Sequence, residues 1–134
     1  MFNKQVNQFA KALDNSDFDE ALKFLDDNCI YYCRGKIYSG NKSIISEYKN
    51  NSDWVENTFE SINYESSTET ISAKQFKIHL TDKISHKGHY LHHKSEQILL
   101  FNDSGLIERI EHIDLPGERE KVDKFFQDCG VTRK

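Results

Sequence analysis

The stretch Ile98-Leu99-Leu100-Phe101-Asn102-Asp103-Ser104-Gly105-Leu106-Ile107 places a strand directly before a tight turn. Residues 98–101 are apolar on both faces, which is typical of a buried strand. Residues 102–105 combine the side chains that favour a hairpin turn. The segment that follows, 106–114, is ambiguous because Ile107, Ile110 and Ile113 recur at a step of three, which suits a helix as well as a strand. Turn formers at both of its ends favour a strand.

The rest of the second half has the same character. Apolar Phe76, Ile78 and Leu80 alternate with polar residues, which predicts a half-buried strand. A closing helix carries Val122, Phe125 and Phe126. After about residue 54 the chain therefore changes from helical to strand periodicity, and a long antiparallel meander is expected.

Helices dominate the first half. Apolar residues at steps of three and four predict a helix from Phe2 to Leu13. A short second helix should begin at a Ser16 or Asp17 cap and be closed by residues 26–28. Residues 29–33 form a predicted strand, and Gly40-Asn41 begins a third helix. Helices followed by a meander indicate the α+β class, with residues 1–134 as one domain.

The composition narrows the class of partner. The 134 residues include nine Phe, six Tyr and one Trp but a single Pro, which argues against disorder. The net charge of −4 with no basic block argues against nucleic acid or an anionic membrane. Three cysteines, no apolar run of membrane-spanning length and a polar N-terminus predict a reduced, cytoplasmic protein.

Three segments carry a resemblance to a known family: Leu25-Asp26-Asp27 entering a strand, Tyr38-Ser39-Gly40-Asn41-Lys42-Ser43-Ile44 opening a helix, and residues 101–107. Together with the element order, they resemble the SnoaL-like and ketosteroid-isomerase-like superfamily, also called nuclear-transport-factor-2-like. The resemblance implies a cone-shaped α+β barrel, in which N-terminal helices pack on a curved antiparallel sheet that encloses a pocket. It also implies a homodimer through the outer sheet face. Members include isomerases, dehydratases, cyclases and non-enzymatic modules.

The catalytic groups of ketosteroid isomerases are replaced in this chain. Those enzymes use an Asp base on the first strand, a Tyr on the first helix and a protonated Asp on the penultimate strand. The corresponding positions fall on Tyr32, Phe9 and Gln97. Phe9 cannot donate a hydrogen bond and a neutral phenol is a poor base, so steroid isomerisation by that mechanism is not expected.

The same alignment turns other residues toward the expected pocket. Ile110, His112 and Asp114 face inward on the last strand, and the pair His112–Asp114 could transfer a proton near neutral pH. Alternatively, Asp114 caps the following turn or pairs with a lysine, and His112 is an ordinary hydrogen-bonded residue. The expected substrate-binding residues are Tyr32, Tyr48, Gln97, Phe9, Trp54, Phe76, Ile78, His93 and Ile110.

The histidine cluster at 86, 89, 92 and 93 invites a metal interpretation. Ligands on one strand must share a parity, and no third ligand is indicated beyond His93 and His112. No metal and no cofactor are therefore expected. His79 has the parity of the outer face.

Two functions remain open. The first is a cofactor-free isomerase, cyclase or dehydratase that acts by acid–base catalysis on an apolar or aromatic carbonyl compound. The second is a non-catalytic ligand-binding or dimerisation module of the same fold. Under either function, the expected partner is a small apolar or aromatic molecule.

Overall fold

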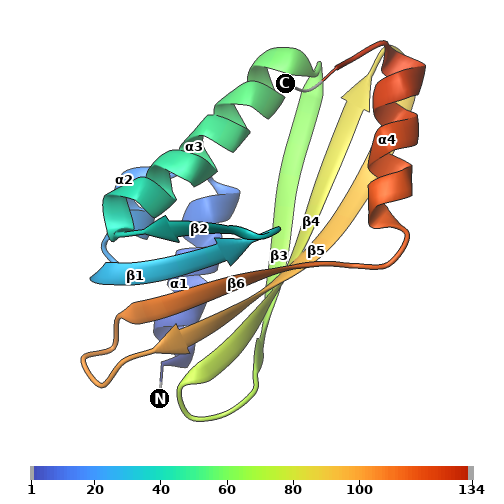
Figure 1. Cartoon of the computed structure of the whole chain (residues 1–134). Helices are drawn as coiled ribbons and strands as arrows, with labels where there is room; N and C mark the ends of the chain where they lie inside the picture. The colour runs from blue at the N-terminus through green and yellow to red at the C-terminus, as the bar shows by residue number, and fades with distance from the viewer. Residues whose placement is uncertain (1, 133–134) are drawn as a thin grey trace.

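The computed structural model describes residues 2–132 and shows helices packed on one six-stranded sheet (Figure 1). The strand order is β2-β1-β6-β5-β4-β3, and the sheet is mixed and does not close into a barrel. The elements are α1 (Asn3–Asp14), α2 (Phe18–Leu22), β1 (Leu25–Cys33), β2 (Lys36–Ser39), α3 (Asn41–Thr58), β3 (Ser61–Thr70), β4 (Gln75–His86), β5 (His89–Phe101), β6 (Ile107–Asp114) and α4 (Glu118–Cys129). The fold is the cone-shaped α+β arrangement expected from the sequence.

The predicted helices and the meander are confirmed. Asp17 caps α2 by accepting a hydrogen bond from the Glu20 backbone N–H at 3.3 Å. From β3 to β6 each strand pairs antiparallel with the next one along the chain, and the turn at 102–105 joins β5 to β6. Gly105 adopts a φ of +81° there, and an added Cβ would lie 3.3 Å from the Phe2 ring.

Two expectations for the first half were wrong. Residues 26–28 do not close α2 but lie within β1, where Asp26 accepts a hydrogen bond from the Asn28 backbone N–H at 2.9 Å. The sheet is also not purely antiparallel, because β1 pairs with β6 in parallel. Strand β2 is an additional edge strand that the sequence did not predict.

A β-bulge explains the step of three in β6. Leu100 pairs with Arg109 but Phe101 pairs with Ile107, so the strand gains one residue at Glu108. Ile107 and Ile110 are both fully buried as a result, whereas Ile113 lies on the outer face. The strand interpretation of this segment is confirmed.

The helices cover one face of the sheet, which we call the inner face. α1 contacts β3, α3 contacts β1, and α4 contacts β5. Two apolar clusters result, one under α1 and the start of α3, the other between the end of α3 and α4. No helix among the described residues is long and apolar enough to cross a membrane.

Candidate functional site

A cleft of about 890 Å³ lies between α3, α4 and the inner face of the sheet. Its volume is within the range of roughly 300–1,000 Å³ that is usual for small-molecule sites. Tyr31, Tyr38 and Tyr48 line what we call the tyrosine end. Trp54, Phe59, Leu91, Val122 and Phe126 line the opposite part, the tryptophan end. Both ends are therefore walled by aromatic or aliphatic side chains.

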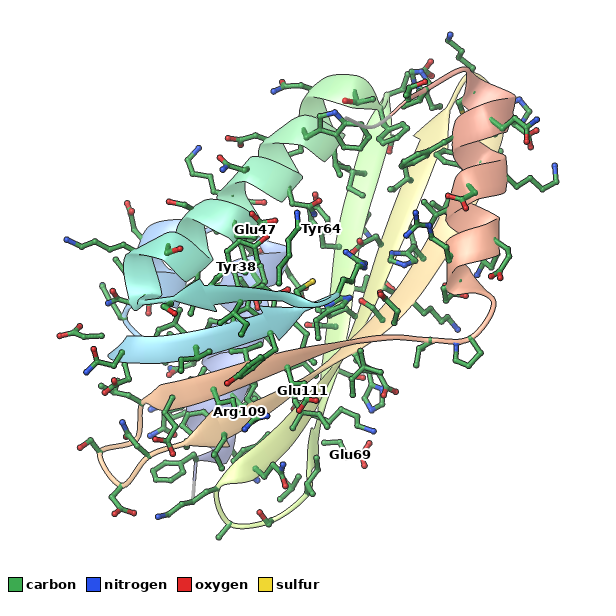
Figure 2. The ribbon with its side chains drawn as sticks, in the orientation of Figure 1. Tyr38, Glu47, Tyr64, Glu69, Arg109 and Glu111 are labelled. Atoms are coloured by element: carbon green, nitrogen blue, oxygen red, sulfur yellow. The ribbon has the colours of Figure 1, made fainter. Side chains whose placement is uncertain are left out.

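The tyrosine end is built from three stacked rings. Tyr31 of β1 stacks on Tyr48 of α3 with centroids 5.4 Å apart and planes 11° apart, and on Tyr38 of β2 at 5.7 Å. Glu47 of α3 lies next to Tyr38 (Figure 2). Phe9 packs edge-on behind Tyr48 at 6.5 Å and supports its ring. This wall is rigid because each ring is held by the next.

Gln97 of β5 organises the polar groups at this end. It is 2% exposed, and its Oε1 accepts a hydrogen bond from the Tyr48 hydroxyl at 2.7 Å. Its Nε2 donates to the Tyr31 hydroxyl oxygen and to His112 Nδ1, both at 3.3 Å. His112 Nδ1 is therefore an acceptor, so Nε2 carries the hydrogen and donates to Asp114 Oδ1 at 3.0 Å.

Arg34 completes the chain of contacts. Its Nε and Nη2 donate to the two carboxylate oxygens of Asp114 at 2.7 and 2.8 Å, a bidentate pair. Arg34 and Gly35 have φ angles of +49° and +79° and form the turn between β1 and β2. That turn brings the guanidinium to the edge of the cleft next to β6.

Burial and charge set the protonation states at this end. Burial lowers the pKa of His112, and the nearby Arg34 guanidinium lowers it further, so the imidazole is neutral at neutral pH. Hydrogen bonds from Arg34 lower the pKa of Asp114, which is a carboxylate. Burial raises the pKa values of Tyr31 and Tyr48, so both phenols keep their protons. The tyrosine end thus holds neutral phenols and a neutral imidazole beside the Arg34–Asp114 ion pair.

A second polar group lies between the two ends. His93 Nδ1 of β5 is 3.9 Å from Asp82 Oδ2 of β4, its cross-strand partner. Asp14 of α1 also lines the cleft and accepts a hydrogen bond from the Ser66 hydroxyl at 2.5 Å. Burial raises the pKa of Asp14, and the charges of Asp82 and Glu65 raise it further. The middle of the cleft therefore holds an imidazole and two carboxyl groups.

Six of the expected site residues line the cleft: Tyr48, Trp54, His93, Gln97, His112 and Asp114. His112 and Asp114 contact each other as expected. Trp54 packs on Phe59 and Phe126, with ring centroids 5.6 and 5.8 Å apart. The cleft therefore collects residues from α3, β5 and β6 that are distant in the sequence.

The expectation that Tyr32 faces the pocket was wrong. Its ring lies on the outer face of the sheet beneath the Arg109 guanidinium, 4.7 Å from the ring centroid. Figure 2 shows Arg109 and Glu111 on β6, on that outer face. Tyr31 faces the cleft instead. The register of β1 is irregular between Leu25 and Ile30, so an alignment counted from residues 26–27 is shifted by one residue at this point and exchanges the two faces of the strand.

Four other expected wall residues face inward but do not line the cleft. They are fully or almost fully buried in the first apolar cluster, beneath the cleft wall: Phe9, Phe76, Ile78 and Ile110. Phe76, for example, packs edge-on against Phe101 at 5.5 Å. The three strand residues Phe76, Ile78 and Ile110 point to the inner face as expected, but helix α1 and the ring of Tyr48 cover this part of the sheet.

The histidine cluster is divided by the β4–β5 hairpin. His86 and His89 are cross-strand partners at its end, and His86 packs edge-on against Phe59 at 5.5 Å. His92 is exposed, and only His93 lines the cleft. No three His, Cys, Asp or Glu side chains within residues 2–132 are grouped as a metal site. His79 lies on the outer face as expected, between Glu69 and Glu96.

Sequence reasoning missed Tyr31, Arg34, Asp14 and Asp82 as lining residues. Tyr31 had a signal, because Cys29, Tyr31 and Cys33 share one strand parity. Arg34 precedes Gly35 in a turn, but nothing local indicates its pairing with Asp114, eighty positions later. No local pattern indicates that Asp14 and Asp82 line the cleft, because their positions depend on the tertiary structure.

Comparisons with protein-family models and with curated proteins find no match. Comparison with solved structures finds many. A predicted SnoaL-like polyketide cyclase from Shewanella denitrificans OS-217 aligns with a TM-score of 0.70 at 11% identity, over 95% of this chain and 97% of that one. An NTF2-like protein of unknown function from Exiguobacterium sp. 255-15 aligns with a TM-score of 0.61 at 13% identity, over 83% and 98%.

A third structure is similar in the same way. TerC, co-crystallised with polyporic acid, aligns with a TM-score of 0.71 at 11% identity, over 94% of this chain and 98% of that one. At such identities the likeness concerns the fold and not the chemistry. With its helices on the inner face of a curved six-stranded sheet, the chain has the fold of the SnoaL-like and nuclear-transport-factor-2-like superfamily.

Proposed function

We propose that the chain binds a small molecule with an apolar or aromatic body and a carbonyl oxygen, and that it catalyses a cofactor-free isomerisation, cyclisation or dehydration. One observation carries this proposal: a cleft of ligand size has apolar and aromatic walls and one hydrogen-bonded group of polar side chains at its tyrosine end. TerC, which has a similar fold, was co-crystallised with polyporic acid, and this supports a small molecule as the partner.

The tyrosine end suits an oxygen that gains negative charge. The Tyr31 oxygen accepts from Gln97, and its O–H faces only the Cys33 sulfur, a weak acceptor that a ligand oxygen can replace. The Arg34 guanidinium lines the same region, paired with the Asp114 carboxylate. Fixed donors around a developing enolate oxygen are the largest source of catalysis in many enzymes.

We assign His112 and Asp114 to holding this end in place, which differs from the proton transfer expected from the sequence. Both nitrogens of His112 are engaged, by Gln97 and by Asp114. Arg34 occupies both oxygens of Asp114 and lowers its pKa, which makes it a weak base. The alternative of a non-catalytic binding module keeps the same cleft and is favoured by the replaced isomerase groups.

Trp54 is the only tryptophan of the chain and lines the cleft, so its fluorescence can report binding. We would titrate the protein with α-tetralone and with tetralin, which has the same shape but no oxygen. α-Tetralone is expected to bind several-fold more tightly, and this advantage should shrink in Tyr31→Phe. Equal affinity for both, or no saturable change, would contradict the proposal.

We also propose that two copies associate through the outer face. Half-buried Ile98, Leu100 and Ile113 lie there, next to the Lys77–Glu96 ion pair of 3.3 Å. Sedimentation velocity should give a dimer that Ile98→Lys converts to a monomer. A monomeric wild-type chain at high micromolar concentration would count against this interface.

A further inference from the structure

We propose that His93, supported by Asp82, is the group that accepts the proton in the cleft. This inference rests on the proposed function and names the residues that would perform its chemistry. The sequence had placed His93 only among the binding residues.

The geometry around His93 suits a base. Its imidazole lines the cleft, 19% of the side chain is exposed, and Nδ1 lies 3.9 Å from the Asp82 carboxylate. Within residues 2–132 no group forms a hydrogen bond with Nε2, so that nitrogen is open to a ligand. A base needs a lone pair within reach of the substrate proton.

His112 differs from His93 in this respect. Its Nδ1 accepts from Gln97 and its Nε2 donates to Asp114, so a ligand proton could reach it only after one of these bonds breaks. His93 is the only cleft histidine in the described part of the chain whose ring is not fixed at both nitrogens. This difference, rather than sequence position, separates the two roles.

Titratable side chains on three elements lie close to His93: Asp82 of β4, Glu118 of α4 and the neutral His112 of β6. Glu118 is already engaged, because it accepts from the Lys94 backbone N–H at 2.6 Å and pairs with Lys121 at 2.9 Å. Asp82 is therefore the carboxylate that stabilises the imidazolium formed when His93 accepts a proton.

A dehydration illustrates the proton transfer that we assign to His93. In a dehydration, His93 Nε2 removes a proton from the carbon next to the carbonyl, and electrons move to the oxygen at the tyrosine end. As they return, the hydroxyl on the next carbon departs and takes the proton from the His93 imidazolium, so the products are the unsaturated carbonyl compound and water. His93 is then neutral again.

The test uses 5-nitrobenzisoxazole, from which any well-placed base removes one carbon-bound proton while the ring N–O bond breaks to give a coloured cyanonitrophenolate. The wild-type protein should react at least ten-fold faster than free imidazole at the same concentration. His93→Gln should lose that excess. His92→Gln, on the exposed face of the same strand, is the matched control and should retain it.

Asp82→Asn tests the supporting role. It should lower the rate several-fold, because the imidazolium that forms on His93 loses its neighbouring carboxylate. Full activity of a folded His93→Gln variant, or a wild-type rate no greater than that of imidazole, would overturn the inference. If α-tetralone still binds in either case, the proposed binding function stands and only the assignment of His93 fails. If α-tetralone does not bind at all, the proposed function itself fails.

Discussion

Replacing Gln97 with leucine should cost more stability than its single position in β5 suggests. The side chain is 2% exposed and bridges Tyr48, Tyr31 and His112. Leucine has a similar volume but leaves the Tyr48 hydroxyl and His112 Nδ1 without partners. An unsatisfied buried polar group costs about 1–3 kcal/mol. Both groups are partly buried, so we expect a loss of about 2–4 kcal/mol in the free energy of unfolding.

The assay is urea unfolding followed by Trp54 fluorescence and circular dichroism, with Gln97→Glu as the matched control. Glutamate keeps an acceptor for Tyr48 and places a negative charge beside His112 Nδ1, so the pKa of His112 should rise from its lowered value. Proton NMR of the His112 ring measures that change. The network would be refuted if Gln97→Leu lowered the free energy of unfolding by less than about 1 kcal/mol and Gln97→Glu left the pKa of His112 unchanged.

Three further changes test other parts of the structure. The pKa of His112 is lowered in the folded chain, so the unfolded chain takes up a proton first as pH falls below about 6.5, and the free energy of unfolding decreases. His112→Gln should remove this part of the pH dependence. An equal loss of stability between pH 7 and pH 5 in the wild type and the variant, measured by urea unfolding, would contradict it. Arg34→Met should raise the pKa of Asp114, as seen by carboxyl NMR, but change stability by less than about 1 kcal/mol because both side chains are about half exposed; an unchanged pKa would disprove the pairing. Phe76→Leu should lower the free energy of unfolding by about 1–2 kcal/mol and leave the affinity for α-tetralone unaltered, since this ring lies in the core. Weaker binding would show that Phe76 does contact the ligand.

Much of the fold could be predicted because local signals agreed with the tertiary structure. The turn at 102–105 and the apolar face of α1 are encoded within a few neighbouring residues. The turn at Lys87 and Gly88, with φ angles of +49° and +80°, joins two strands whose extents were not predicted. The parallel pairing of β1 with β6 has no local signal at all, because its partners are far apart in the chain.

Part of the site could be predicted because the alternation of side chains is regular in the strands that carry it. Gln97 and His112 are direct partners in a regular stretch of β5 and β6, so both point to the inner face as expected. Parity failed for Tyr32, where the register of β1 is irregular. It could not separate lining residues from buried ones such as Ile78, because that depends on which helix covers the strand. Arg34 required the folded turn itself.

The central claim is that the cleft binds an aromatic molecule with its oxygen at the tyrosine end. An NMR titration of the labelled protein with α-tetralone tests it most directly. We predict saturable shifts of the Gln97 side-chain amide and the Trp54 indole N–H, with the outer-face signals of Tyr32 and Arg109 unchanged. Shifts confined to that outer face, or none up to the solubility limit of the ketone, would contradict the claim.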